Sequence, residues 1–522
     1  MPLVGRAKAD VVTIKKNLKD LEIIVLGKGR STDIRARAPP ISRLPPELLL
    51  PIFLYAVHTQ FVSGDTPRDR FLCIGVSHVC QHWRHVALGC SDIWSYIDTT
   101  WRSLAMEFVR RSREAPLTVF VRLIHLPSIM EVAAINVVLA EDQVGRIREL
   151  QISADNMNYH IFHFNKCMSA ARLQALSMNN SSRISLMPNN FFLSHPGTLK
   201  SLVLSNLDPP RDPQMLRSLT RLKVSTDWRI HTAFLRVSDI VTMLQLCPDL
   251  EEFEFSENGA FLDSGISPHV TAPLLALQHV RLTMTSKAYV ALLSHLTTSP
   301  AVTVYIDASQ CGGPPEPVPT VFLNVYDALT VKITENGYFV ITAFSINDAE
   351  NQTTATVHCR YDPGPNLTID FRLLEALFKP VLQHAHSLSI HFHIDETYNI
   401  PRSNWTNLLL ALPILGCLTI KSESAIRLKL PPDIIVSLAR ALETLDAYRP
   451  LNRRPTLHTL AFDGIPFTGK AGKAALSHMT TFVGSCELSN AKIARIDLTN
   501  CSGITSQSVQ PLECFVDEVI WN

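Results

Sequence analysis

Apolar residues recur at helical spacing in two short stretches near the start of the chain. The first stretch predicts one helix with an apolar face, formed by Leu48, Leu49, Ile52, Phe53, Ala56 and Val57. Pro45 and Pro46 suit a first helical turn, whereas Pro51 is expected to kink or restart the helix. A second helix is predicted by a stripe of the same kind, formed by Val76, Val79, Cys80, Trp83 and Ala87. Such helices must pack on each other or on a partner.

From residue 147 onward, aliphatic triplets replace the helical pattern. The starts of the first six triplets, from Ile147 to Leu277, advance by 20 to 31 residues, which resembles the spacing of leucine-rich repeats, about 20–29 residues. In each triplet the last two members are expected to point inward from one face of a short strand. The triplets are Ile147/Leu150/Ile152, Leu173/Leu176/Met178, Leu199/Leu202/Leu204, Leu219/Leu222/Val224, Leu250/Phe253/Phe255, Leu277/Val280/Leu282, Leu415/Leu418/Ile420, Leu457/Leu460/Phe462 and Ile493/Ile496/Leu498.

One segment departs from this repeat. After the proline-rich residues 311–319, residues 329–361 alternate between apolar and polar positions, and Asn336-Gly337 interrupts the alternation. Asn-Gly between alternating stretches indicates a β-hairpin. We therefore predict a β-meander inserted in the repeat region, with helical character resuming at 373–382.

The N-terminal pattern resembles an F-box of fungal type. The resemblance rests on the run Leu44-Pro45-Pro46-Glu47-Leu48-Leu49, on Ile52-Phe53, and on Val79-Cys80 followed by Trp83-Arg84 and Ala87. Residues 92–97 are similar to the tryptophan-bearing extension that follows such F-boxes, and Cys501-x-x-Ile504 to a repeat often found behind them. The resemblance implies an adaptor-binding surface made of Leu44, Pro45, Glu47, Leu48, Leu49, Ile52, Phe53, Val79, Cys80, Trp83, Arg84 and Ala87.

The expected fold is therefore α+β and multidomain, with a small helical F-box followed by an irregular α/β leucine-rich-repeat-like solenoid. The predicted parts are a tail and linker (1–40), the F-box and its extension (41–98), a repeat-like region (99–310), the proline-rich loop and β-meander (311–365) and a C-terminal repeat-like region (366–522).

Composition narrows the classes of partner. Hydrophobic residues make up 46% and charged residues 18% of the chain, as in folded proteins. A net charge of +1 provides no bulk attraction to nucleic acid or to a membrane surface, so neither partner is expected. The 11 cysteines form no CxxC pair, and Lys8, Lys15 and Lys16 interrupt any apolar signal segment. Reduced thiols and a cytoplasmic or nuclear location are expected.

Candidate catalytic and metal motifs are incomplete. Residues 464–471 resemble a phosphate-binding loop with its lysine at Lys470, but Ala471 replaces the hydroxyl residue that holds magnesium and Pro466 removes a backbone donor. The histidines lack a cysteine or carboxylate at zinc-ligand spacing, and we interpret them as strand, loop and helix-surface residues: His384, His386, His391, His393, His78 and His82. No catalytic residue, cofactor or metal is predicted.

Charged residues stand between the inward-pointing pairs of three triplets. If these strands are neighbours, one outward surface carries Arg221, Lys223, Glu252, Glu254, His279 and Arg281. This pattern has two interpretations, solvated cross-strand pairs or a face that recruits a protein of complementary charge.

The F-box resemblance implies a non-enzymatic substrate-recognition subunit of a Skp–cullin–F-box ubiquitin ligase. Its F-box would bind the Skp-family adaptor, and through it cullin, while the repeat body recruits an unidentified protein substrate. Two alternatives stay open. The chain could be an F-box scaffold outside any ligase, or a nucleotide-dependent enzyme that uses Lys470.

Overall fold

The computed structural model describes residues 44–63, 72–123, 129–155, 170–181, 185–186, 198–208, 213–226, 236–257, 270–284, 286–299, 302–307, 318, 326–334, 338–345, 354–360, 371–393, 400–422, 432–448, 457–488 and 492–521. The predicted N-terminal tail and the Asn336-Gly337 turn lie outside these ranges. The chain divides into two compact units, Met1–Ile93 and Trp94–Asn522. The segment 94–97, which the sequence assigned to the F-box extension, thus belongs to the larger unit.

The described part of the smaller unit is helical, with α2 (Pro46–Ser63), α3 (Leu72–Ser77) and α4 (Gln81–Gly89). Helix α2 begins at the proline pair, where the Leu48 and Leu49 amides donate to the Pro45 carbonyl oxygen at 3.0 and 3.1 Å. The helix continues through Pro51 and does not restart there. A proline removes one backbone hydrogen bond, and the buried face of α2 offsets that loss.

The stripe from Val76 to Ala87 does not form the single helix that the sequence predicted. The chain leaves the helical conformation at Cys80 (φ −156°, ψ 171°), between α3 and α4. Cys80 caps α4, because its Sγ accepts a hydrogen bond from the Trp83 amide at 3.4 Å. Val76 before the break and Trp83 and Ala87 after it are all buried. The apolar pattern therefore continues across the break, and periodicity alone does not reveal it.

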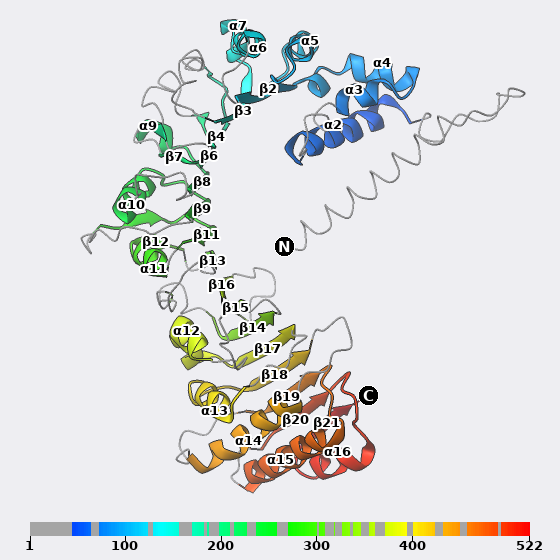
Figure 1. The fold of residues 1–522 in the computed structure, drawn as a ribbon, viewed down its shortest axis with the longest axis vertical. Helices are drawn as coiled ribbons and strands as arrows, with labels where there is room; N and C mark the ends of the chain where they lie inside the picture. Colours follow the sequence, from blue (N-terminus) through cyan, green and yellow to red (C-terminus); the bar gives the residue numbers. More distant parts are fainter. Residues whose placement is uncertain are drawn as a thin grey trace, which may run out of the picture. The chain divides into compact units, whose positions relative to one another are not determined.

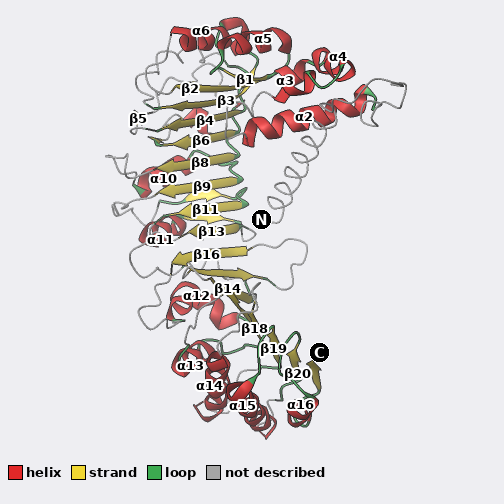
Figure 2. Cartoon of the chain, turned by 45° about the vertical axis from the view of Figure 1, so that its right-hand side comes forward, coloured by secondary structure: helices red, strands yellow, loops and turns green. Residues whose placement is uncertain are grey.

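Among the described residues, the larger unit is built on one sheet of 17 strands, seen as successive arrows in Figure 2. In spatial order the strands are β1 (Tyr96–Asp98), β2 (Leu117–Leu123), β3 (Ile147–Ala154), β4 (Ala175–Asn180), β6 (Ser201–Ser205), β8 (Arg221–Thr226), β9 (Glu252–Glu257), β11 (His279–Thr283), β13 (Thr303–Asp307), β16 (Thr354–Arg360), β15 (Tyr338–Phe344), β14 (Ala328–Thr334), β17 (Ser387–His393), β18 (Cys417–Ser422), β19 (Thr459–Asp463), β20 (Arg495–Leu498) and β21 (Glu518–Trp521). Small parallel pairs join β5 (Ser185–Leu186) to β7 (Leu207–Asp208) and β10 (Ala272–Leu274) to β12 (Leu296–Thr298).

The aliphatic triplets set the register of this sheet. Leu202 of β6 pairs with Leu222 of β8, which in turn pairs with Phe253 of β9. In the C-terminal part, Leu418 pairs with Leu460 in the same way. The last two members of every predicted triplet lie in a strand and are buried. The strand predicted at each triplet is therefore confirmed, and the alternation of burial leaves the intervening residues on the opposite face.

The predicted antiparallel segment is present as β14, β15 and β16, which form a β-meander. It does not interrupt the sheet. Strand β16 pairs with β13 and β14 pairs with β17, both in parallel, so the chain passes through the sheet in reversed order at this point. Strand β15 makes the antiparallel pairs of the 17-stranded sheet.

Helices return the chain between many of these strands. Figure 1 shows α10 to α14 on one side of the sheet. After the short 3-10 helix η3 (Ser91–Trp94), the helices are α5 (Arg102–Ser112), α6 (Ile129–Val138), α7 (Glu141–Val144), α9 (Pro213–Leu216), α10 (Val237–Gln245), α11 (Ser286–Ser294), α12 (Arg372–His384), α13 (Arg402–Leu410), α14 (Pro432–Tyr448), α15 (Gly469–Leu488) and α16 (Ser506–Glu513). The fold is mixed α/β with a large, mostly parallel sheet.

Candidate functional site

Helix α2 has one apolar stripe that belongs to the core of the smaller unit. Leu49, Phe53 and Val57 are buried on this side. The Phe53 and Trp83 rings lie 4.9 Å apart between centroids, which joins α2 to α4. Trp83 Nε1 is buried and has no hydrogen-bond partner among the described residues, so apolar packing holds this indole in place.

A second apolar stripe of α2 faces outward. Leu48, Ile52 and Tyr55 are 54%, 50% and 58% exposed, respectively. Their spacing of four and three residues places them on one helix face. We call these three residues the exposed stripe. Large apolar side chains grouped on a surface mark an interaction site more often than isolated ones do.

The twelve residues that the F-box resemblance placed on one adaptor-binding surface do not all lie on the surface of the smaller unit. Leu49, Phe53, Trp83 and Ala87 are buried in the smaller unit, and Cys80 caps α4. Leu44 is half-buried, whereas exposed positions are held by Pro45, Glu47, Leu48, Ile52, Val79 and Arg84. In the sequence, the buried and exposed stripes of α2 look like one apolar face, because Leu48 and Leu49 are adjacent, as are Ile52 and Phe53. The sequence pattern also did not include Tyr55.

The sequence suggested that His82 is a solvated residue on a helix surface, but in the structure it makes a hydrogen bond to the backbone. Its Nε2 donates a hydrogen bond to the Leu44 carbonyl oxygen at 3.0 Å. This bond ties α4 to Leu44, two residues before the start of α2.

The outward face of the larger unit brings together the six charged residues that the sequence singled out. Strands β8, β9 and β11 are neighbours, with Arg221, Glu252 and His279 in one register row and Lys223, Glu254 and Arg281 in the next. Arg221 Nε lies 3.1 Å from Glu252 Oε2, and Lys223 Nζ lies 2.9 Å from Glu254 Oε1. Two of the three cross-strand neighbours in each row therefore neutralise each other.

The row of Lys223, Glu254 and Arg281 continues onto residues that the sequence did not reveal. The Arg281 guanidinium lies over the Tyr305 ring of β13, 4.6 Å from its centroid. The Tyr305 ring in turn lies 4.7 Å from the His358 ring of β16. No local pattern predicts this contact, because Tyr305 and His358 meet only through the reversed order of the meander. We call Arg281, Tyr305 and His358 the stacked cluster.

The loop that resembles a phosphate-binding motif is closed by its own packing. It joins β19 to α15, as such a loop should. However, the Phe467 amide donates to the Ser502 carbonyl oxygen at 2.8 Å. A Cβ at Gly472 would lie 2.2 Å from the Phe467 carbonyl carbon. Backbone amides of this loop donate hydrogen bonds to residues 499–502 and are not available to a phosphate group. This weighs against a phosphate-binding site.

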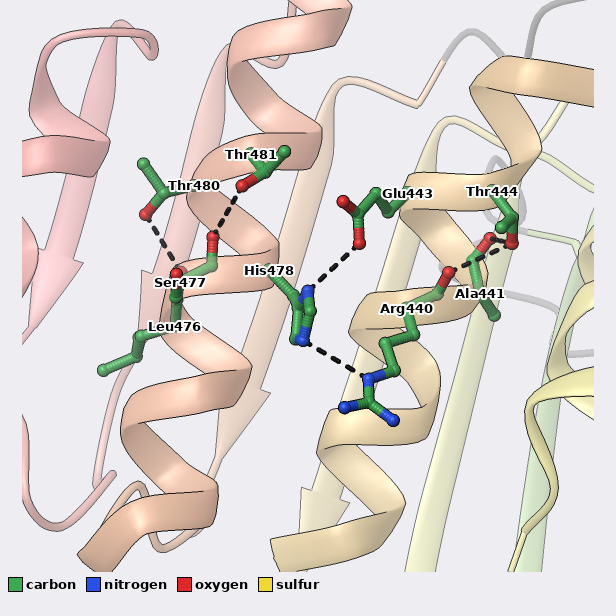
Figure 3. A network of polar contacts seen from close by, with 9 residues as sticks. All are labelled: Arg440, Ala441, Glu443, Thr444, Leu476, Ser477, His478, Thr480 and Thr481. Carbon is green, nitrogen blue, oxygen red and sulfur yellow. Dashed lines mark hydrogen bonds and ion pairs between the residues drawn. The ribbon is translucent and has the colours of Figure 1, made fainter.

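A histidine–carboxylate pair bridges α14 and α15 (Figure 3). His478 Nδ1 donates to Glu443 Oε2 at 3.0 Å, and His478 Nε2 accepts from Arg440 Nε at 3.3 Å. A general base needs its second ring nitrogen free for a nucleophile or a substrate. Here a guanidinium occupies that nitrogen, so the arrangement joins two helices and gives no support to acid–base chemistry.

The described residues contain neither a metal-ligand cluster nor a membrane-spanning helix. No group of three or more His, Cys, Asp or Glu side chains in them is placed to hold a metal ion. His391 and His393 lie on the same face of β17, as predicted, and His391 Nε2 is 2.8 Å from Ser389 Oγ. None of the described helices combines the length and apolarity that a membrane crossing requires.

Comparison with known proteins adds no assignment. No protein-family model matches the chain, and no curated protein matches it.

Proposed function

We propose that this chain is the substrate-recognition subunit of a Skp–cullin–F-box ubiquitin ligase. In this proposal the smaller unit is the F-box that binds the Skp-family adaptor, and the larger unit recruits the protein to be modified. The observation that carries the proposal is the exposed stripe of Leu48, Ile52 and Tyr55, which lies on a helix whose other stripe already forms the core. A helix face of this kind is suited to docking on another protein.

The size of the exposed stripe fits an anchoring contact. Full burial of a large apolar side chain contributes about 1.5–3 kcal/mol, and each of these side chains is about half exposed. Covering all three would therefore supply a few kcal/mol. Exposed Pro45 and Glu47 at the start of α2 would form part of the polar rim that surrounds such a contact.

The sheet of the larger unit supports the recruiting role. Parallel sheets usually have both faces covered by helices. In this sheet the outward positions of β8, β9 and β11 are exposed or half-buried. Repeat proteins leave one face of their stacked strands uncovered and bind partners there, and the triplet spacing resembles leucine-rich repeats.

The proposed mechanism needs no covalent chemistry from this chain. An adaptor held on the exposed stripe and a protein held on the outward face would be joined through one molecule. The effective concentration of the bound protein near the conjugating enzyme then rises, and transfer becomes effectively intramolecular.

The test is a pair of charge substitutions in the exposed stripe, Leu48→Asp with Ile52→Asp. Binding of the full-length chain to a purified Skp-family adaptor should fall by more than about tenfold, because two desolvated apolar contacts are lost. The melting temperature should change little, since both side chains are exposed. Leu275→Asp, at a site that is 70% exposed in the larger unit, is the matched control. Undiminished adaptor binding by the double variant would contradict the proposal.

Two further measurements separate the alternatives. Co-purification of cullin with the adaptor complex distinguishes a ligase subunit from a scaffold that holds the adaptor alone. A nucleotide-binding assay on the wild type and on Lys470→Ala tests the enzyme alternative.

A further inference from the structure

Arg281 differs from the other cations of its face. Arg221 and Lys223 each pair with a glutamate on β9 at 3.1 and 2.9 Å. Arg281 is exposed and makes no ion pair with any described residue. Its register neighbour on β9 is Glu254, whose carboxylate is engaged by Lys223. The Arg281 side chain turns instead to the opposite neighbour, Tyr305.

In the stacked cluster the Arg281 guanidinium lies over an aromatic ring. The Arg281 guanidinium carbon lies 4.6 Å from the Tyr305 ring centroid, and the His358 ring centroid lies 4.7 Å from that of Tyr305. Both rings are half-buried and sit on the paired strands β13 and β16. An arginine stacked on an aromatic face keeps its N–H edge available for hydrogen bonds. Because contact with the ring restricts the Arg281 side chain, binding an anion there costs less conformational entropy than at an arginine without such a contact.

We propose that the stacked cluster binds a carboxylate, an aspartate or glutamate side chain of the recruited protein, through the guanidinium of Arg281. This inference rests on the proposed recruiting role of the outward face. A carboxylate accepts two parallel N–H bonds from a guanidinium, which gives direction as well as affinity. The surrounding pairs, Arg221 with Glu252 and Lys223 with Glu254, contribute a neutral rim.

The local charge favours a carboxylate over a phosphoryl group. Asp307 is the register partner of His358 and lies two residues after Tyr305, so a negative charge stands at the edge of the cluster. Burial lowers the pKa of His358 below its usual value, so this ring is neutral near pH 7. Asp307 repels any anion bound at Arg281 in proportion to the charge of that anion. A carboxylate carries one negative charge, whereas a phosphoryl group carries about −1.5 to −2 at this pH, so the repulsion is smaller for the carboxylate.

The experiment uses oriented pools of biotinylated peptides, degenerate except for one central residue. The central residue is Glu, Gln, Lys or phosphoserine, and binding of each pool to the full-length chain is measured. We expect the Glu pool to bind about five- to tenfold better than the Gln pool, as a charge-assisted pair of hydrogen bonds provides. Arg281→Gln should abolish this preference, and Arg281→Lys should keep only part of it, because lysine lacks the planar fork.

The matched control is Arg221→Gln, which removes an exposed arginine of the same face whose charge is already paired with Glu252. This variant should keep the preference for Glu. Equal binding of the Glu and Gln pools, loss of the preference in Arg221→Gln, or stronger binding of the phosphoserine pool would overturn the assignment. Adaptor binding is measured on the same preparations. Its absence from the wild type would contradict the proposed function, whereas its survival in Arg281→Gln shows that only the stacked cluster was altered.

Discussion

The smaller unit and the outward face of the sheet present opposite kinds of surface. The smaller unit exposes an apolar stripe of Leu48, Ile52 and Tyr55. The sheet exposes charges that largely neutralise each other, as in the pairs Arg221–Glu252 and Lys223–Glu254. Apolar burial is non-directional and contributes most of the affinity in stable complexes. Complementary charges contribute mainly discrimination between partners and the rate of association. Under the proposed function, the apolar stripe would bind the adaptor and the charged face would discriminate between recruited proteins.

The two regions also differ in how their cores are built. The core of the smaller unit depends on contacts between α2, α3 and α4, with Trp83 and Phe53 at their meeting point. The larger unit repeats the same inward pair of residues from strand to strand. A repeated core spreads stability over many similar neighbours, whereas a small helical core has few residues to lose.

The largest expected effect is therefore in the smaller unit. Trp83→Ala should destabilise it by about 3–5 kcal/mol, the usual cost of removing a buried aromatic side chain. This is comparable to the whole stability of a small domain. Hydrogen exchange should show loss of protection in 46–63 and 81–89, with protection in the strands at 201–205 and 221–226 retained. Simultaneous loss of protection in both regions would contradict the division of the chain into independent cores.

Trp83→Phe is the matched control. The indole Nε1 has no hydrogen-bond partner among the described residues, so its removal leaves no polar group unsatisfied. A phenyl ring also preserves the aromatic contact with Phe53. This variant should remain folded and keep adaptor binding, whereas Trp83→Ala should lose it through unfolding, not through loss of a direct contact.

The same comparison shows what the sequence could predict. The triplets predicted the strands and their inward faces, because a period of two and a regular repeat are local properties of the chain. They also placed Arg221, Glu252 and His279 on one surface, which the register of β8, β9 and β11 confirms. The capping bond of Cys80 was missed because periodicity carries no information about it.

The stacked cluster was beyond prediction for a different reason. The expected meander was right, but its reversed placement, with β16 beside β13, is a long-range pairing. Local alternation cannot say which of the three strands joins the preceding part of the sheet. The contact between Tyr305 and His358 exists only because of that choice.

A second prediction compares the two sides of one strand. Glu252 and Glu254 of β9 point outward, whereas Glu257 is buried beside Thr226 of β8. Its Oε2 has no hydrogen-bond partner among the described residues, and burial raises its pKa from 4.5 to about 7. The folded state thus binds the proton more tightly than the unfolded state. The resulting stabilisation is fully present below pH about 4.5 and is lost as the pH rises through about 7.

Glu257→Gln should therefore raise the free energy of unfolding at pH 8 by up to about 3 kcal/mol, at 1.36 kcal/mol per unit of pKa shift. At pH 4.5 the substitution should have little effect, because the native carboxyl is already protonated there. Urea denaturation at the two pH values measures both quantities, and Glu252→Gln on the exposed side of the strand is the control. An equal effect of Glu257→Gln at both pH values would show that this carboxyl is not the titrating group.

The smallest expected effect is on the outward face itself. Lys223 Nζ lies 2.9 Å from Glu254 Oε1, and both side chains are partly exposed to solvent. Exposed ion pairs of this kind contribute about 0.2–1 kcal/mol to the free energy of unfolding. A double-mutant cycle with Lys223→Gln and Glu254→Gln should give a coupling energy below about 1 kcal/mol, which falls further at 1 M salt as the Debye length shortens to about 3 Å.

In Lys223→Gln the Glu254 carboxylate is released beside its register neighbour Arg281. It should then compete for the guanidinium and reduce the preference for Glu peptides without affecting adaptor binding. A coupling energy well above 1 kcal/mol would show that this ion pair mainly stabilises the fold. The charged face would then not be explained by discrimination between partners, in contrast to the apolar stripe of the smaller unit.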